Sequence, residues 1–392
     1  MPLNLGHISQ EVDSLAQTVA GSLPSQQHLL QQAQELLRSV SADALRQKLE
    51  LHHSQRTRIP WLVATPRGPL ASAIPAPSPP RDFCVVGTDA SSIAPDRHSS
   101  VRYYVINVGY AVLRYGSVPD ALLEAQGQLC FRDEDVYIFP ETRRVPVEGT
   151  LLAARMEVHS LRILEQALQG AKGPVIALRD GPLILWTLQN EDGKVQQAVL
   201  NDFLGALAYL KDAGVAVAGY ISYTDGRDVS NSLRVWLCPN LAADCLRCKS
   251  DHHELCTALA EIRDRELFSF LAEGQRSELF SSSSQILEQY GEHRVDFFYF
   301  NAGGEIARVE VPQWLAADDE MLSLLHAAIY DQCRRSPAFP PYPPALVEAH
   351  EQAVITTSER QVVEEMVERA LGRLGQVVVR SAKEVSKRRR GV

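Results

Sequence analysis

The sequence lacks the features that mark a membrane or secreted protein. None of its apolar runs approaches the roughly 18 to 20 residues that a membrane span requires. The N-terminus carries Gln10, Glu11 and Asp13 in place of the basic start and apolar middle of a secretory signal. Both absences predict a cytoplasmic protein that has no membrane contact.

An excess of positive charge is also missing. The chain has 39 Lys and Arg against 48 Asp and Glu, a formal net charge of −9, which argues against nucleic-acid binding over the whole surface. A local basic groove stays compatible with this charge. Seven cysteines, an odd number without an export signal, predict thiols and no disulfide framework.

What the chain does contain is enough apolar material for a large core, because 45% of its 392 residues are hydrophobic and 22% are charged.

Residues 1–64 predict an N-terminal helical arm, interpreted as a hairpin packed on the main domain, with a dimer or partner contact as the alternative. Residues 65–81 are Pro-rich and predict a linker. Residues 82–375 predict the main domain, and 376–392 a basic tail. Helical spacing in the arm involves Leu29, Leu30, Ala33, Leu36 and Leu37.

The main domain has a readable order of elements, β-β-β-α-β-α-β. Three strands in succession predict a meander, and the two β-α-β units that follow predict parallel strands joined by right-handed crossovers. The fold class is therefore α/β, one mixed sheet flanked by helices in the ribonuclease H-like layout. The predicted strands span 83–88, 101–115, 136–139, 174–178 and 215–221, and the helices 147–169 and 198–213.

Two carboxylates follow buried strands. Asp89 comes after the strand 83–88, and Asp180 after the strand 174–178, where Gly181 permits a sharp turn. Because these two strands are predicted to be parallel neighbours, both carboxylates should meet at one edge of the sheet. An Asp after a strand is also a common turn residue, which is the simpler interpretation of either one alone.

A third carboxylate comes from the helix 147–169. At 100° per residue, Glu157 shares the apolar stripe and should face the sheet, whereas Glu165 falls at its margin and is the reserve candidate. The alternative is that Arg155 or Arg179 neutralises Glu157. Three clustered carboxylates need cations, and two Mn²⁺ or Mg²⁺ ions about 3.5 to 4 Å apart are the usual solution in phosphodiester chemistry.

Six motifs in order resemble the NurA nucleases over roughly residues 80–365. They are the strand-Asp-Ala-Ser start at 85–91, Arg-Met-Glu at 155–157, Leu-Arg-Asp-Gly-Pro-Leu at 178–183, Ala-Gly-Tyr-Ile-Ser at 218–222, Ala-Arg-Val-Glu-Val-Pro at 307–312 and Tyr-Pro-Pro-Ala-Leu-Val-Glu-Ala-His at 342–350. The resemblance implies a Mn²⁺-dependent 5′ to 3′ exonuclease with single-strand endonuclease activity. It further implies a homodimer that acts on DNA beside a HerA-type hexameric ATPase in end resection.

Carried over by motif, Asp89, Glu157 and Asp180 would hold the metal ions and His350 would complete the site, with Tyr220 lining it. The family motif often ends in Asp where this chain has His350, and either residue can ligate a metal. The alternatives for His350 are that it orients the attacking water, contacts a phosphate, or lies on a helix surface. Nearby substitutes are Glu348 and Glu351, whereas Asp225 and Asp228 are typical of turns.

Four cysteines form a separate pattern inside a predicted insertion at 238–256. Cys238, Cys245, Cys248 and Cys256, or His252 in place of the last, would be the ligands of a structural zinc ion. Only one tight Cys-x2-Cys pair is present, so reduced thiols are the favoured interpretation.

The aromatic run 297–300 leaves alternatives open. It predicts a hairpin strand that serves core packing or a dimer surface as well as it serves base stacking.

The leading hypothesis is a metal-dependent deoxyribonuclease. The alternatives are a non-catalytic, nuclease-like platform for a DNA-translocating ATPase and a metal phosphoesterase that acts on small substrates.

Overall fold

The computed structural model describes most of the chain. The described residues are 5–54, 59–96, 101–139, 143–169, 171, 173–240, 243–246, 248 and 254–375. The α-helices are α1 (Leu5–Ser39), α2 (Ala42–Ser54), α3 (Asp133–Val136), α4 (Thr150–Ala167), α5 (Gly193–Asp212), α6 (Asp228–Leu237), α7 (Glu254–Leu259), α8 (Asp264–Leu267), α9 (Gln313–Ala316), α10 (Asp319–Arg335), α11 (Pro344–Ala353) and α12 (Thr357–Arg373). The strands are β1 (Ala64–Pro66), β2 (Ile74–Pro75), β3 (Phe83–Ile93), β4 (Tyr104–Tyr115), β5 (Asp120–Cys130), β6 (Tyr137–Ile138), β7 (Val145–Pro146), β8 (Val175–Asp180), β9 (Ala216–Ile221), β10 (Gln275–Arg276), β11 (Phe280–Ser282), β12 (Val295–Asn301) and β13 (Ile306–Pro312).

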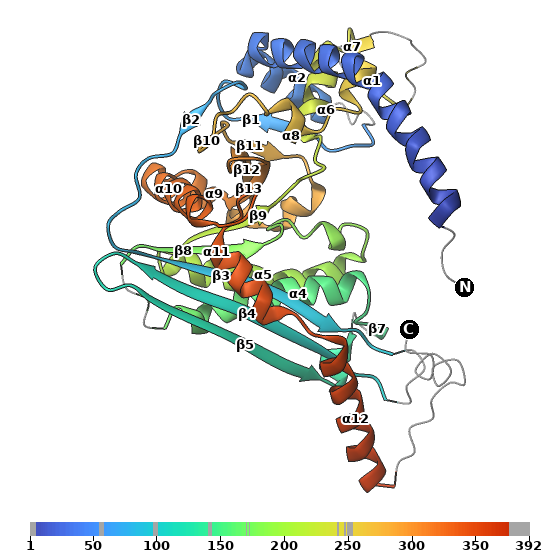
Figure 1. The fold of residues 1–392 in the computed structure, drawn as a ribbon, viewed down its shortest axis with the longest axis vertical. Coiled ribbons are helices and arrows are strands. Elements are labelled where there is room, and N and C mark those ends of the chain that lie inside the picture. The colour runs from blue at the N-terminus through green and yellow to red at the C-terminus, as the bar shows by residue number, and fades with distance from the viewer. Residues whose placement is uncertain are drawn as a thin grey trace.

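One large mixed sheet runs through the molecule (Figure 1), with the strand order β1-β11-β12-β13-β9-β8-β3-β4-β5. Strands β3, β4 and β5 form an antiparallel meander, and β8 and β9 lie parallel to β3 because helices α4 and α5 make the crossovers. This is the ribonuclease H-like arrangement, and it confirms the predicted fold class.

Two apolar layers cover the two faces of this sheet, as alternation along a strand requires. Cys84 and Val86 of β3 pack with Ala177 of β8 against α4 and α5. Val85 and the residues Ile176 and Leu178 pack on the other face against α10 and α11. Alternate residues of β3 and of β8 therefore contact different helices, one set α4 and α5 and the other set α10 and α11.

A third apolar layer joins the N-terminal helices to the far end of the sheet. Ala33 and Leu37 of α1 and Leu45 and Leu49 of α2 are buried against α6, α7, α8 and the aromatic strand β12. This packing agrees with the interpretation of the arm as a hairpin on the main domain. In Figure 1 the start of α1 and the whole of α12 extend away from the body.

Two predicted strands differ from the observed ones. The third strand of the meander is β5 rather than 136–139, whose residues end α3 and then pair as β6 with β7. The sequence of β5 gave no apolar pattern because ten of its eleven residues are exposed. Strand β3 continues through Asp89 to Ile93, so this carboxylate lies within a strand and not after it.

The segment 65–81 was also predicted as a linker, yet it contributes to the sheet. Residues of β1 pair with β11, and those of β2 pair with β10. Leu70, which lies between β1 and β2 in the sequence, is buried. Short edge strands tolerate proline because one side of the backbone needs no partner. The basic tail at 376–392 lies outside the described residues. No described helix combines the length and apolar character that crossing a membrane requires.

Candidate metal centre

Helix α11 lies directly on the sheet because two glycines leave room for its backbone. A Cβ on Gly87 of β3 would lie 2.0 Å from the carbonyl oxygen of Ala345, and one on Gly109 of β4 would lie 2.1 Å from that of Ala349. Both distances are far below any van der Waals contact, so only glycine fits at these positions. The helix begins at Pro344, where a missing N–H costs nothing.

Two polar side chains of the sheet fix the other end of α11. The hydroxyl of Ser91 donates to the carbonyl oxygen of Ala353 at 2.5 Å, and the amide of Asn107 donates to the same oxygen at 2.9 Å. These bonds satisfy carbonyl groups that a helix end leaves without partners. Helix α11 is thus held at its start by close packing and at its end by hydrogen bonds.

This packing brings Asp89, Asp180 and His350 together. One potential ligand atom from each lies within 4.8 Å of the other two. His350 Nδ1 lies 2.7 Å from Asp89 Oδ2, and Asp89 Oδ1 accepts the N–H of Ala90 at 2.7 Å. An ionised carboxylate can only accept, so a proton on Nδ1 leaves His350 Nε2 with its lone pair available.

Asp180 is the second half-buried carboxylate of the cluster. It ends β8, and the hydroxyl of Tyr342 donates to its Oδ1 at 2.9 Å. Burial raises the pKa of Asp180, the hydrogen bond from Tyr342 opposes the rise, and the charge of Asp89 adds to it. A cation in the cluster would relieve the repulsion between the two carboxylates.

Tyr220 lies beside this cluster, and its hydroxyl forms no hydrogen bond with either carboxylate. It lies opposite Asp180 in the register of β8 and β9, is completely buried, and packs edge-on against Tyr342 with ring centroids 5.3 Å apart. The tyrosine hydroxyl that bonds to Asp180 is that of Tyr342. A lining role for Tyr220 stays a prediction.

Glu157 does not belong to the group of ligand atoms. Its carboxylate forms an ion pair with Arg179, which was the alternative left open from the sequence. The alternation of side chains along β8 explains why Glu157 meets Arg179 and not Asp180, because Asp180 faces α10 and α11 whereas Arg179 faces α4. Electrostatic interactions with Asp180 and Asp89 nevertheless act on Arg179, so this ion pair lies behind the cluster. Burial lowers the pKa of Arg179 to about 10, and the two carboxylates oppose that change.

The reserve candidates lie outside the cluster. Glu165 and Glu351 are exposed, and Asp225 is an exposed turn residue that pairs with Arg263. Asp228 was predicted as a turn residue, but it is buried at the start of α6 and pairs with Arg308. Glu348 is half-buried on α11.

The four cysteines of the predicted insertion are near one another without forming a compact group. The charges of Cys238, Cys248 and Cys256 all act on the Cys245 thiol, whose pKa burial raises to about 11. Among the described residues, however, three ligand atoms come within 4.8 Å of one another only at Asp89, Asp180 and His350. Zinc binding by the cysteines stays a prediction, and His252 lies outside the described residues.

The donor set suits a hard divalent cation. Two carboxylates and an imidazole nitrogen are ligands that Mn²⁺ accepts, and Mg²⁺ accepts the carboxylates together with water. The side chain of His350 is 58% exposed and that of Asp89 is 19% exposed, so the cluster opens to solvent on the side of α11. Ions held there would be accessible from solvent.

Sequence reasoning missed Tyr342 although it stands in one of the motifs. It precedes His350 by eight residues, across the prolines that begin α11, and nothing in its spacing indicated a contact with β8. The available signal was a tyrosine beside a Pro-Pro helix start in the same motif as a candidate ligand. Tertiary packing of α11 was needed to join the two.

Comparison with known proteins gives one family match. The family model described as the NurA domain matches residues 84–355. No curated protein matches the sequence. The solved structures that are similar to this chain include the NurA nuclease from Sulfolobus solfataricus (13% identity, 95% of this chain and 98% of that chain, TM-score 0.49), NurA with manganese (12%, 90% and 98%, 0.37), and LC9-RNase H1, a type 1 RNase H with the type 2 active-site motif (12%, 40% and 69%, 0.22).

Proposed function

The chain belongs to the NurA family, and from this premise we propose that it is a nuclease that hydrolyses phosphodiester bonds of DNA with the help of divalent cations. The single observation that carries the proposal is the convergence of Asp89, Asp180 and His350 within 4.8 Å on a ribonuclease H-like sheet. Two half-buried carboxylates beside an imidazole repel one another, and a cation would relieve that repulsion.

The three candidate ligands and Tyr342 would have different roles at the metal ions. Asp89 and Asp180 supply the anionic oxygens for Mn²⁺ or Mg²⁺, and Tyr342 holds the Asp180 carboxylate in place through its hydroxyl. His350 either adds its free ring nitrogen to the ligand set or orients the attacking water, and its position against Asp89 suits both. Cations bound there would activate the water and stabilise the leaving oxygen of the phosphodiester.

Glu157 is proposed as a further ligand from helix α4, as the family motif implies. To reach the ions, its carboxylate would exchange Arg179 for a cation. The three described ligand groups suffice for one ion. A second ion, as the phosphodiester chemistry favours, needs a fourth group such as Glu157.

The wider biology is proposed from the family resemblance. We expect a 5′ to 3′ exonuclease with single-strand endonuclease activity that acts in DNA end resection in the cytoplasm. A homodimer and a HerA-type hexameric ATPase are the expected partners. The exposed start of α1, with Leu5, Val12 and Leu15, offers apolar surface for such contacts.

A nuclease assay tests the proposal. Purified protein is incubated with single- and double-stranded DNA of defined ends, in Mn²⁺, in Mg²⁺ and in EDTA. We expect degradation with Mn²⁺ and none with EDTA. Absence of cleavage with either ion, both alone and with the ATPase added, would favour the non-catalytic platform. Cleavage of small phosphodiesters but not of DNA would favour the small-substrate phosphoesterase.

A further inference from the structure

The segment that follows Asp180 is fixed by a buried carboxylate on another strand. Glu310 of β13 is completely buried, and its Oε2 accepts the backbone N–H groups of Leu183 at 2.8 Å and Ile184 at 3.1 Å. Leu183 and Ile184 are themselves completely buried, so no water can replace this acceptor. Leaving such N–H groups without a partner costs about 1–3 kcal/mol each.

Other contacts confine the same segment between Gly181 and Leu185. The Gly181 N–H donates to the carbonyl oxygen of Tyr220 at 3.0 Å. The hydroxyl of Tyr290 accepts the Leu185 N–H at 2.9 Å and donates to the Leu183 carbonyl at 3.1 Å. Within this set Glu310 is the charged acceptor, and charge-assisted hydrogen bonds are the stronger kind.

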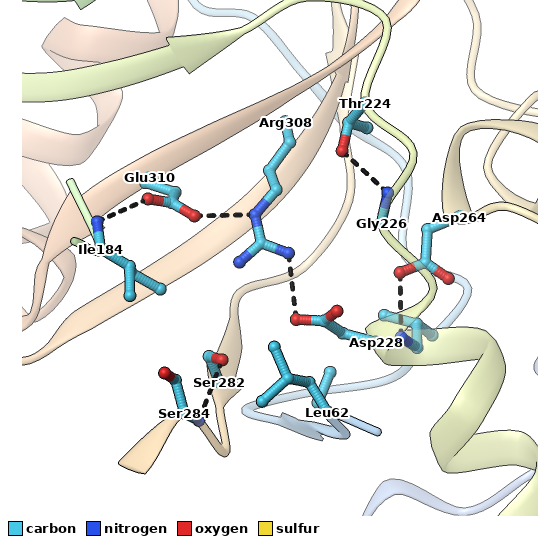
Figure 2. Close-up of polar contacts among 12 residues, drawn as sticks. Leu62, Ile184, Thr224, Gly226, Asp228, Asp264, Ser282, Ser284, Arg308 and Glu310 are labelled. Atoms are coloured by element: carbon cyan, nitrogen blue, oxygen red, sulfur yellow. Dashed lines mark hydrogen bonds and ion pairs between the residues drawn. The ribbon is translucent and has the colours of Figure 1, made fainter. Parts of the chain in front are cut away.

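The position of Glu310 is in turn fixed by a buried ion-pair chain (Figure 2). Its Oε1 accepts a hydrogen bond from Arg308 Nε at 2.9 Å, and Arg308 Nη1 donates to Asp228 Oδ2 at 3.1 Å. The Arg308 guanidinium also lies 3.6 Å from the centroid of the Phe297 ring. Burial alone would lower the pKa of Arg308, but Asp228 and Glu310 outweigh it and raise the pKa, so the guanidinium stays charged.

We propose that Glu310 is a positioning residue for the metal centre: by holding the N–H groups of Leu183 and Ile184, it fixes the turn after β8 and so keeps the Asp180 carboxylate facing Asp89 and His350. The inference rests on the proposed function. Asp180 ends its strand, and the next residue is a glycine with φ of +108°, which by itself would leave the turn free to move. Glu310 removes this freedom without touching substrate or metal.

The functional consequence is a preformed cation site. A ligand whose backbone is held in place loses little freedom when the cation binds, whereas a loose turn would spend part of the binding free energy on ordering. Groups that orient metal ligands typically change metal affinity by about 10- to 100-fold when they are removed. Glu310 should belong to that class although it lies on the opposite face of the sheet from the cluster.

The test compares Glu310→Gln with Asp296→Asn. The glutamine side chain keeps the size but cannot accept from both the turn and Arg308, because one of its terminal groups is an NH₂. Asp296 is the matched control, since it is completely buried on the neighbouring strand β12 and accepts from Ser281 and Gln313 without contacting residues 181–185. Three quantities are measured for each protein: melting temperature, Mn²⁺ affinity from the EPR signal of free Mn²⁺, and hydrogen exchange of the peptide that covers residues 181–185 without metal.

We expect both variants to melt at a lower temperature than wild type. Only Glu310→Gln should bind Mn²⁺ about 10- to 100-fold more weakly and exchange faster at 181–185. Unchanged Mn²⁺ affinity and exchange in Glu310→Gln, with normal binding by wild type, would overturn the inference alone. Wild-type protein that binds no Mn²⁺ would overturn the proposed function and the inference with it.

A second variant covers the case in which Glu310→Gln does not fold. Arg308→Lys keeps the buried positive charge but removes the Nε–H that orients Glu310. A smaller loss of Mn²⁺ affinity in the same direction is expected. Wild-type affinity in folded Arg308→Lys would contradict a positioning role for the Glu310 carboxylate.

Discussion

His350 Nδ1 on helix α11 lies 2.7 Å from Asp89 Oδ2 on strand β3, although 261 residues separate the two in sequence. The contact exists because Gly87 and Gly109 admit the helix backbone onto the sheet. It joins the C-terminal motif to the first carboxylate, so that the exposed side chain of His350 belongs to the candidate group of metal ligands.

This contact gives a prediction that separates the roles of His350. If it ligates a cation, His350→Asp should retain more Mn²⁺ affinity than His350→Ala, because a carboxylate can replace the imidazole as a ligand. Titration of both variants with Mn²⁺ measures the difference. Equal losses, or a greater loss in His350→Asp, would indicate that His350 instead contacts the phosphate or the water.

Tyr342→Phe removes the hydroxyl that donates to Asp180 and leaves the ring packed on Tyr220. The carboxylate then loses an orienting hydrogen bond, so Mn²⁺ affinity should fall by about 10-fold or more while the melting temperature changes little. Tyr330→Phe is the control, because its hydroxyl donates to Glu273, away from the cluster. Equal Mn²⁺ affinities in the two variants would show that Tyr342 only packs.

Glu157→Gln decides between a ligand and a partner of Arg179. If Glu157 is a ligand, it should be needed for cleavage. The rate of DNA degradation by the folded variant should then fall by roughly 100-fold, the upper end of the effect of groups around a metal. As a partner only, its loss would leave the buried Arg179 charge without compensation. The melting temperature would then fall while cleavage per folded molecule stayed near the wild-type value.

Stability should depend on pH through His326. Burial, with Arg276 nearby, lowers the pKa of His326 to about 4, and a ring nitrogen lies 2.9 Å from the carbonyl oxygen of Gly274. An unfolded histidine titrates near 6.5, so between about pH 6.5 and 4 the unfolded chain binds more protons and stability falls as the pH falls. His326→Gln keeps a donor without a titrating group.

The free energy of unfolding of wild type relative to His326→Gln should decline by about 3 kcal/mol between pH 7 and pH 4, at roughly 1.4 kcal/mol per pKa unit. Denaturant melts of both proteins at several pH values measure this difference, and the shared contributions of buried acids cancel. Parallel curves for the two proteins would show that His326 does not carry the dependence.

The sequence predicted those parts of the fold that local pattern determines. Continuous apolar runs and a helix stripe were enough for β3, β8, β9, α4 and α5, and thus for the parallel placement of Asp89 and Asp180. Strand β5 was not predicted, because an exposed edge strand has no buried face to produce alternation of apolar and polar residues. The strands within 65–81 were not predicted because they are short and Pro-containing, with Pro66 in β1 and Pro75 in β2, so that local composition resembles that of a linker.

The site was predictable to the same extent. Asp180 was predicted from its place at a strand end, and His350 from motif resemblance. The pairing of Glu157 with Arg179 could not be predicted in this way, because it depends on side-chain direction at the sheet. Arg308 and Glu310 did carry a signal: they alternate with Val309 and Val311 in a strand that otherwise reads as buried. Two opposite charges at that spacing indicate a buried polar chain, but only the fold shows that it ends at the turn after Asp180.

Whether Asp89 and Asp180 form a cation-dependent nuclease centre is tested most directly by DNA cleavage with matched variants. Wild type, Asp89→Asn, Asp180→Asn and the control Asp202→Asn, whose carboxylate pairs with Arg155 and Arg162 on α4, are compared on end-labelled single-stranded DNA with Mn²⁺. We expect cleavage by wild type and Asp202→Asn and none by the two site variants, with all four proteins folded. Undiminished Mn²⁺-dependent cleavage by folded Asp89→Asn or Asp180→Asn would show that these carboxylates do not form such a centre.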